Sequence, residues 1–206
     1  MASLLEKQPQ LMRSRSGVTI PASQAAASLF QQYLPAPTVG QLVEANNLLL
    51  QLQTTYEPLV FRHGLNLKDL RIVTVSDSSL GKASKYSQGG HIIMLSEDCQ
   101  DHVCKHMIPL WSRSSRSKRV AASTMAAETL AMGSGAENAG FIQTWLYEIL
   151  HPGTIADLIN LSGSELVPHD VCVDCNDLYE TLVQPAFPNL SNKALTLYLA
   201  MPRELR

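Results

Sequence analysis

The chain has 206 residues, which is long enough for one sizeable core with a small appended piece. Hydrophobic residues make up 45% and charged residues 17%, a balance that excludes a disordered chain, a collagen and a coiled coil. Sixteen Lys and Arg against 18 Asp and Glu give a formal net charge of -2, which excludes coating of nucleic acid by bulk positive charge but leaves room for a local basic patch.

The N-terminal residues carry neither a signal-length apolar core nor a clear periodicity. Residues 1–20 are therefore expected to form a loose leader, and Glu6 falls where a signal peptide would be apolar. No run of about 18 apolar residues occurs anywhere, so we expect an intracellular protein without a membrane contact.

A helical segment is predicted for residues 21–66. Residues 25–34 are rich in Ala, Leu and Gln, and the prolines at 35 and 37 then interrupt the pattern. Thr38 is a plausible cap for a second helix that runs to about Leu52.

The pattern changes to strands in residues 67–206, which are predicted to form a second domain. Three β-rich runs, 72–77, 89–95 and 106–111, suggest an antiparallel meander. A long helix follows over 123–150, then a short strand over 171–173. Two further helices are predicted over 176–183 and from 192 toward 202. The order β-β-β-α-β-α-α predicts a mixed α/β domain.

Three acidic residues fall at positions where a carboxylate needs a partner. Asp77 ends the first predicted strand, on the same face as Val73 and Val75. Glu128 points in the same direction as Leu146 on a helical wheel, so it lies on or beside the apolar stripe that must face the sheet.

Asp174 follows the fourth predicted strand. If that strand lies parallel to the first, Asp77 and Asp174 emerge together at carboxyl ends, where open α/β sheets bind ligands. Taken singly, each acid has a plainer explanation: a turn cap for Asp77, a solvated side chain for Glu128 and a helix cap for Asp174. Together they describe an oxygen-ligand site suited to Mg²⁺ or Mn²⁺.

Five blocks of sequence carry a family resemblance. They are Val75-Ser76-Asp77-Ser78-Ser79, Ser87-Gln88-Gly89-Gly90-His91-Ile92-Ile93, Ile108-Pro109-Leu110-Trp111-Ser112, Ala122-Ser123-Thr124-Met125-Ala126-Ala127-Glu128-Thr129-Leu130-Ala131 and Val173-Asp174-Cys175-Asn176-Asp177-Leu178-Tyr179. In order and spacing they resemble the ribonuclease H region of copia-type retrotransposon polyproteins, which combine a reverse transcriptase with a ribonuclease H. The match covers about residues 70–204.

The resemblance implies a fold, an activity and a set of partners. The fold is a ribonuclease H-like mixed sheet flanked by helices, here preceded by a helical remnant of the connection to the polymerase. The activity is metal-dependent endonucleolytic hydrolysis of the RNA strand of an RNA:DNA hybrid. By position, Asp77, Glu128 and Asp174 are the catalytic and metal-binding acids for two Mg²⁺ or Mn²⁺ ions, with Asp77 bridging them.

A reverse transcriptase polymerase domain is the partner that the resemblance suggests. No adjacent Asp-Asp pair occurs in this chain, so we expect no polymerase activity from it.

One departure from the family pattern affects the second metal site. The family's fourth acid aligns with Tyr198, and a phenol is a poor ligand for Mg²⁺. Pro202 also interrupts the last predicted helix. These changes predict a degenerate nuclease, and the alternative is a catalytically inactive nucleic-acid-binding or interaction module of the same fold.

Basic residues gather just before the helix that carries Glu128. Arg113, Arg116, Lys118 and Arg119 lie among serines without an intervening acid, and we interpret the segment as a loop. Such a loop is either simply solvated or contacts the phosphates of the hybrid, and the resemblance favours contact.

Cysteines, histidines and tryptophans give weaker signals. The pairs Cys172-x-x-Cys175 and Cys99-x4-Cys104 leave a zinc-stabilised structural domain as a further alternative, although the first pair falls on a predicted strand. The histidines near these pairs are His91, His102, His106 and His169. The two tryptophans lie in apolar patterns and are predicted to belong to the core.

Overall fold

The computed structural model describes residues 24–33, 36–54, 65, 69–80, 86–97, 107–153 and 166–184. These residues fall into two compact units, one helical with the short stretch Ser112–Arg116, the other built around a sheet. The predicted leader, the predicted last helix with Tyr198, and the pair Cys99 and Cys104 lie outside the described residues.

The helical unit contains α2, Gln24–Gln31, and α3, Val39–Thr54, as the sequence pattern predicts. Thr38 caps α3 reciprocally with Gln41: its Oγ1 accepts the Gln41 N–H at 3.3 Å, and its own N–H donates to Gln41 Oε1 at 2.8 Å. Buried Ala27 and Ala45 join the two helices through a small apolar cluster. Both helices and the predicted cap are therefore confirmed.

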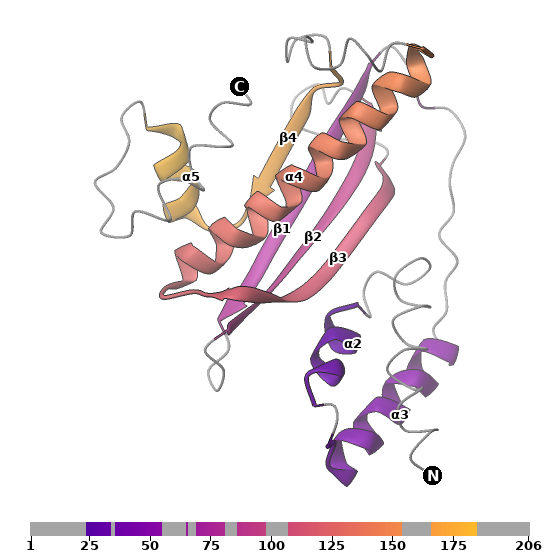
Figure 1. Ribbon diagram of the computed structural model, residues 1–206, viewed down its shortest axis with the longest axis vertical. Coiled ribbons are helices and arrows are strands. Elements are labelled where there is room, and N and C mark those ends of the chain that lie inside the picture. Colours follow the sequence, from indigo (N-terminus) through magenta and orange to yellow (C-terminus); the bar gives the residue numbers. More distant parts are fainter. Residues whose placement is uncertain are drawn as a thin grey trace. The chain divides into compact units, whose positions relative to one another are not determined.

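Among the described residues, four strands form a sheet in the order β3-β2-β1-β4 (Figure 1). They are β1, Leu70–Leu80; β2, Tyr86–Glu97; β3, Met107–Val120; and β4, His169–Val173. β1 pairs antiparallel with β2 and parallel with β4, so the sheet is mixed. The parallel pairing requires a crossover, and the chain segment between β3 and β4 supplies it through a helix.

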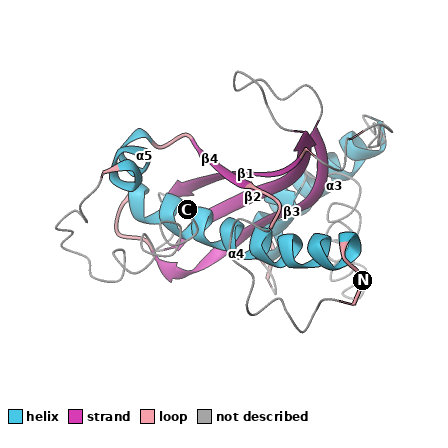
Figure 2. Cartoon of the chain, turned by 90° about the horizontal axis from the view of Figure 1, so that it is seen from above, coloured by secondary structure: helices cyan, strands magenta, loops and turns pink. Residues whose placement is uncertain are grey.

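That crossover helix is α4, Thr124–Leu150, which covers one face of the sheet against β1 and β2 (Figures 1 and 2). Ser123 caps it, because its Oγ accepts the Ala126 N–H at 3.1 Å. The shorter α5, Asn176–Val183, follows β4. A mixed sheet flanked by helices and preceded by a helical segment is the fold class that the resemblance implies, and it is confirmed.

Small side chains allow α4 to approach the sheet closely. A Cβ at Gly135 would lie 2.9 Å from Thr74 Cγ2, too close for any residue larger than glycine to fit without a shift. Further along, Ala139 and Ile142 of α4 pack against Ile72 and Ile93 in a buried cluster. This contact fixes where the first turns of α4 lie relative to β1.

The prediction for the tryptophans is wrong. Trp111 is 50% exposed and Trp145 is 62% exposed. Trp145 lies on the outer face of α4, whereas its neighbour Leu146 packs against the buried cluster of Ile72, Ile93, Ala139 and Ile142. Trp111 lies on β3, an edge strand of the described sheet, with a neighbouring strand on one side only. Within the described part of the chain, no helix has the length and apolarity needed to cross a bilayer.

The basic segment is not a loop. Arg113, Arg116, Lys118 and Arg119 all lie within β3, which continues to Val120, and all four are exposed. Their serine-rich pattern lacks the apolar alternation that identifies a half-buried strand, so the sequence favours a loop. Charged side chains are common on edge strands because they oppose pairing with another chain.

Candidate metal centre

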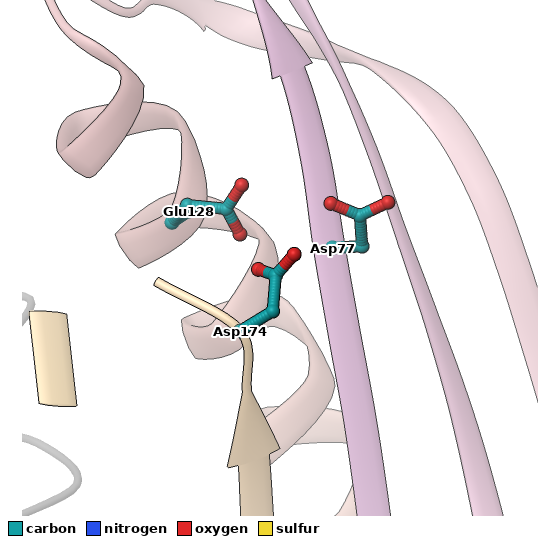
Figure 3. A group of neighbouring side chains, drawn as sticks. All are labelled: Asp77, Glu128 and Asp174. Carbon is teal, nitrogen blue, oxygen red and sulfur yellow. The ribbon is translucent and has the colours of Figure 1, made fainter. Parts of the chain in front are cut away.

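Three carboxylates meet at one end of the sheet (Figure 3). Asp77 comes from β1, Glu128 from the second turn of α4, and Asp174 directly follows β4. One ligand oxygen from each lies within 4.8 Å of the others. The structure thus brings together all three acids singled out in the sequence.

The parallel pairing of β1 with β4 places the two aspartates side by side. Ser76 pairs with Val173 in the last step of this register, and the next residue of the chain after each of them is an aspartate. The prediction that Asp77 ends its strand needs correction, because β1 continues to Leu80. Asp77 instead lies where β1 loses its β4 neighbour, and its side chain is exposed.

Glu128 is the buried member of the group, with only 3% of its surface exposed. Its Oε1 accepts two hydrogen bonds from Ser78: one from the backbone N–H at 3.1 Å and one from the hydroxyl at 2.9 Å. Its Oε2 is buried and has no hydrogen-bond partner among the described residues. The placement of Glu128 toward the sheet, predicted from the helical wheel, is confirmed.

Burial raises the pKa of the Glu128 carboxyl above its usual value. The two hydrogen bonds from Ser78 act in the opposite direction, because they stabilise the charged form. The negative charges of Asp77 and Asp174 add to the rise. A carboxylate in this position is therefore costly to ionise unless a positive charge offsets it.

A divalent cation fits this donor set. Carboxylate oxygens are the ligands that Mg²⁺ and Mn²⁺ prefer, and three of them converge here. The unpartnered Glu128 Oε2 also lacks the hydrogen bond that a buried oxygen normally has, and a cation would satisfy it. Two exposed carboxylates and one buried one leave the group open to solvent on the aspartate side.

The zinc alternative gains no support from the described residues. Cys172 is exposed and Cys175 partly buried, and both are free thiols. Within that part of the chain, the acidic group is the one set of three or more metal-ligating side chains that lie together, and neither cysteine belongs to it. His91 and His169 are engaged elsewhere, with Asn138 Nδ2 at 3.0 Å and Thr74 Oγ1 at 2.9 Å respectively.

Of the four basic residues, Lys118 and Arg119 belong to the same compact unit as the acids. They lie at the end of β3, and residues 121–123 then lead directly into α4, which carries Glu128. Arg113 and Arg116 fall in the stretch that belongs to the helical unit.

Ser78 is the residue of the centre that the sequence did not single out. The available signal is the period of the strand: Ser78 shares a face with Ile72 and Thr74, which are buried beneath α4.

Comparisons with known proteins add little to this geometry. No protein-family model matches the chain, and no curated protein matches it either. Among solved structures, the chain is similar to LC11-RNase H1, isolated from compost by a metagenomic approach. The identity is 10%, the alignment covers 66% of this chain and 74% of that chain, and the TM-score is 0.32. At this TM-score the similarity supports no conclusion about the chain. The fold described above is taken from the strand pairing of this chain itself.

Proposed function

We propose that the chain is a ribonuclease H-like nuclease domain that hydrolyses the RNA strand of an RNA:DNA hybrid with the help of Mg²⁺ or Mn²⁺. The observation that carries the proposal is the convergence of three carboxylates, one of them with a buried oxygen that has no hydrogen-bond partner. The sequence resemblance supplies the reaction and the substrate, and it also supplies the proposed origin from a copia-type retrotransposon.

Each acid has a distinct part in this proposal. Asp77 and Asp174 are exposed and present carboxylates toward solvent, where a substrate phosphate arrives, while Glu128 closes the group from the side of α4. A bound divalent cation supplies charge stabilisation for the attacking water and the leaving 3′ oxygen. Hydrolysis then joins the water oxygen to phosphorus and breaks the bond to the 3′ oxygen, which leaves a 5′-phosphate and a 3′-hydroxyl.

The basic end of β3 is proposed to hold the hybrid. In this proposal Lys118 and Arg119, which are exposed and lie in the same compact unit as the acids, neutralise backbone phosphates. Arg113 and Arg116 are also exposed, and they were singled out with this pair in the sequence, but they belong to the other unit. Such contacts position a duplex without reading its sequence.

Cleavage of a labelled hybrid tests the proposal. An RNA:DNA hybrid with end-labelled RNA is incubated with the full chain in Mg²⁺ or Mn²⁺, beside Asp77→Asn and beside Glu137→Gln. Glu137 is an exposed residue of α4 outside the acidic group and serves as the matched control. Cleavage by the unaltered chain and the Glu137 variant but not by the Asp77 variant is expected. An intact hybrid in both metals removes the enzymatic proposal.

Tyr198 decides between an intact and a degenerate nuclease. The resemblance aligns it with the family's fourth acid, so we propose that the second cation is held weakly. In the same assay Tyr198→Asp is expected to raise the cleavage rate. If neither protein cleaves but both bind the hybrid in a salt-sensitive manner, the alternative of an inactive binding module takes the place of the nuclease.

A further inference from the structure

We infer that Ser78 is the positioning residue that fixes which oxygen of Glu128 faces the cation, an inference that rests on the proposed function. Two donors from this one residue converge on Oε1: the backbone N–H at 3.1 Å and the hydroxyl at 2.9 Å. A carboxylate oxygen has two lone pairs in its plane, so these two bonds occupy the accepting capacity of Oε1.

The other oxygen is thereby left for the cation. Oε2 is buried, has no hydrogen-bond partner among the described residues, and belongs to a carboxylate whose neighbours are Asp77 and Asp174. Rotating the carboxylate to offer both oxygens would break both bonds from Ser78. Glu128 therefore offers a single oxygen, and Ser78 decides which one.

The strand geometry explains why the donor comes from position 78. Ser78 shares a face of β1 with Thr74, whose Cγ2 lies close to Gly135 of α4, so Ser78 lies on the side of α4. Ser78 and Asp77 are neighbours in β1, and Glu128 of α4 is the acid that Ser78 contacts. Ser78 therefore connects Glu128 to Asp77, because it donates hydrogen bonds to Glu128 and directly follows Asp77 in the chain.

A glycine in the adjacent strand allows α4 to lie close enough to β1 for the contact between Ser78 and Glu128. Gly89 of β2 pairs with Ser78, and a Cβ at Gly89 would lie 3.2 Å from the Cβ of Ala131, one turn beyond Glu128 in α4. A side chain at position 89 would displace the helix by a few tenths of an ångström. The Gly89 position of the Ser-Gln-Gly-Gly block therefore has a physical role: it lets α4 come close enough for Oε1 to reach Ser78.

Direct Mn²⁺ binding to the full chain at pH 7.5 tests the inference, with free Mn²⁺ measured by electron paramagnetic resonance. Ser78→Ala is expected to weaken binding by about 10- to 100-fold, the range typical for removal of a residue that orients a metal ligand. Ser78→Thr restores the hydroxyl and is expected to return the affinity to within about threefold of the unaltered chain, a change smaller than that range. Ser79→Ala is the matched control, because Ser79 is the exposed next residue of the same strand.

A second variant tests the same contact through the helix. Gly89→Ala leaves every ligand and Ser78 in place but is expected to weaken Mn²⁺ binding, because it pushes Glu128 away from β1. Urea unfolding of each variant in EDTA separates this effect from loss of the fold: the affinity of a folded variant must fall while its unfolding midpoint in EDTA stays within the range of the Ser79 control.

The outcomes separate this inference from the function on which it rests. If the unaltered chain binds no Mn²⁺, the proposed function fails and the role of Ser78 fails with it. If the unaltered chain binds Mn²⁺ and Ser78→Ala binds it equally well, the role of Ser78 alone is overturned. Loss of binding that Ser78→Thr does not restore also overturns it.

Discussion

Replacing Glu128 with Gln should stabilise the metal-free protein while removing its response to metal. Glu128 is 3% exposed, and its ionised carboxylate faces two other carboxylates within 4.8 Å. Gln keeps the shape of the side chain and an acceptor for Ser78, and it replaces the unpartnered oxygen with an NH₂ group that can donate to Asp77 or Asp174.

The size of the effect follows from the separation of the charges. Two like charges no more than 4.8 Å apart repel by at least about 0.9 kcal/mol even at the dielectric constant of water. Two such pairs are removed, so Glu128→Gln is expected to raise the free energy of unfolding by roughly 2 kcal/mol at pH 7.5 in EDTA. Because the folded-state pKa of Glu128 lies above its unfolded value, this gain is fully present above the folded-state pKa and disappears once the pH falls below the usual value of 4.5.

Urea unfolding measures the gain in the free energy of unfolding. Adding Mn²⁺ should make the unaltered chain the more stable of the two proteins. At a Mn²⁺ concentration of 100 times Kd, the unaltered chain should gain about 2.7 kcal/mol and the Gln variant much less. Glu137→Gln, at an exposed position of the same helix, should show neither change. If Glu128→Gln lowers the free energy of unfolding of the metal-free protein, repulsion among the three acids does not determine how Glu128 affects stability.

Two further predictions concern pH and salt. Burial lowers the pKa of His169, which is hydrogen-bonded to Thr74, below its usual value of 6.5. The unfolded chain therefore binds this proton more tightly than the folded chain does. The contribution of His169 to the free energy of unfolding should be constant above about pH 7.5, fall as the pH drops below the usual pKa of 6.5, and level off below the folded-state pKa. His169→Gln should reduce this fall, and an equal pH dependence of the two proteins would contradict the assignment. Neutralising both Lys118 and Arg119 should weaken hybrid binding at low salt and reduce the magnitude of the slope of log K against log salt concentration by about 1 to 2. An unchanged slope would mean that the phosphates of the hybrid do not contact these two residues.

Much of the site could be predicted from sequence because its positions depend on local periodicity. The helix predicted over 123–150 carries Glu128, and in the structure it runs from Thr124 to Leu150. The 3.6-residue period alone places Glu128 on the buried face. Asp174 could be paired with Asp77 on the assumption of a parallel fourth strand, which the register confirms.

What could not be predicted depends on neighbours distant in sequence. The hydrogen bonds from Ser78 to Glu128 join residues 50 positions apart, and no pattern around either one specifies them. The extension of β3 through Arg113 and Lys118 arises from pairing with β2 rather than from an apolar alternation of its own. Which apolar side chain near the end of α4 packs against the sheet is also settled only in three dimensions: Leu146 contacts the buried cluster, and Trp145 is exposed.

The 3′ end of the cleaved RNA strand tests the central claim most directly. With Mn²⁺ and an RNA:DNA hybrid, the unaltered chain should release RNA fragments that carry a 3′-hydroxyl, and Asp77→Asn should release none. Fragments that end in a 2′,3′-cyclic phosphate, or equal cleavage by the Asp77→Asn variant, would contradict hydrolysis at the centre formed by Asp77, Glu128 and Asp174.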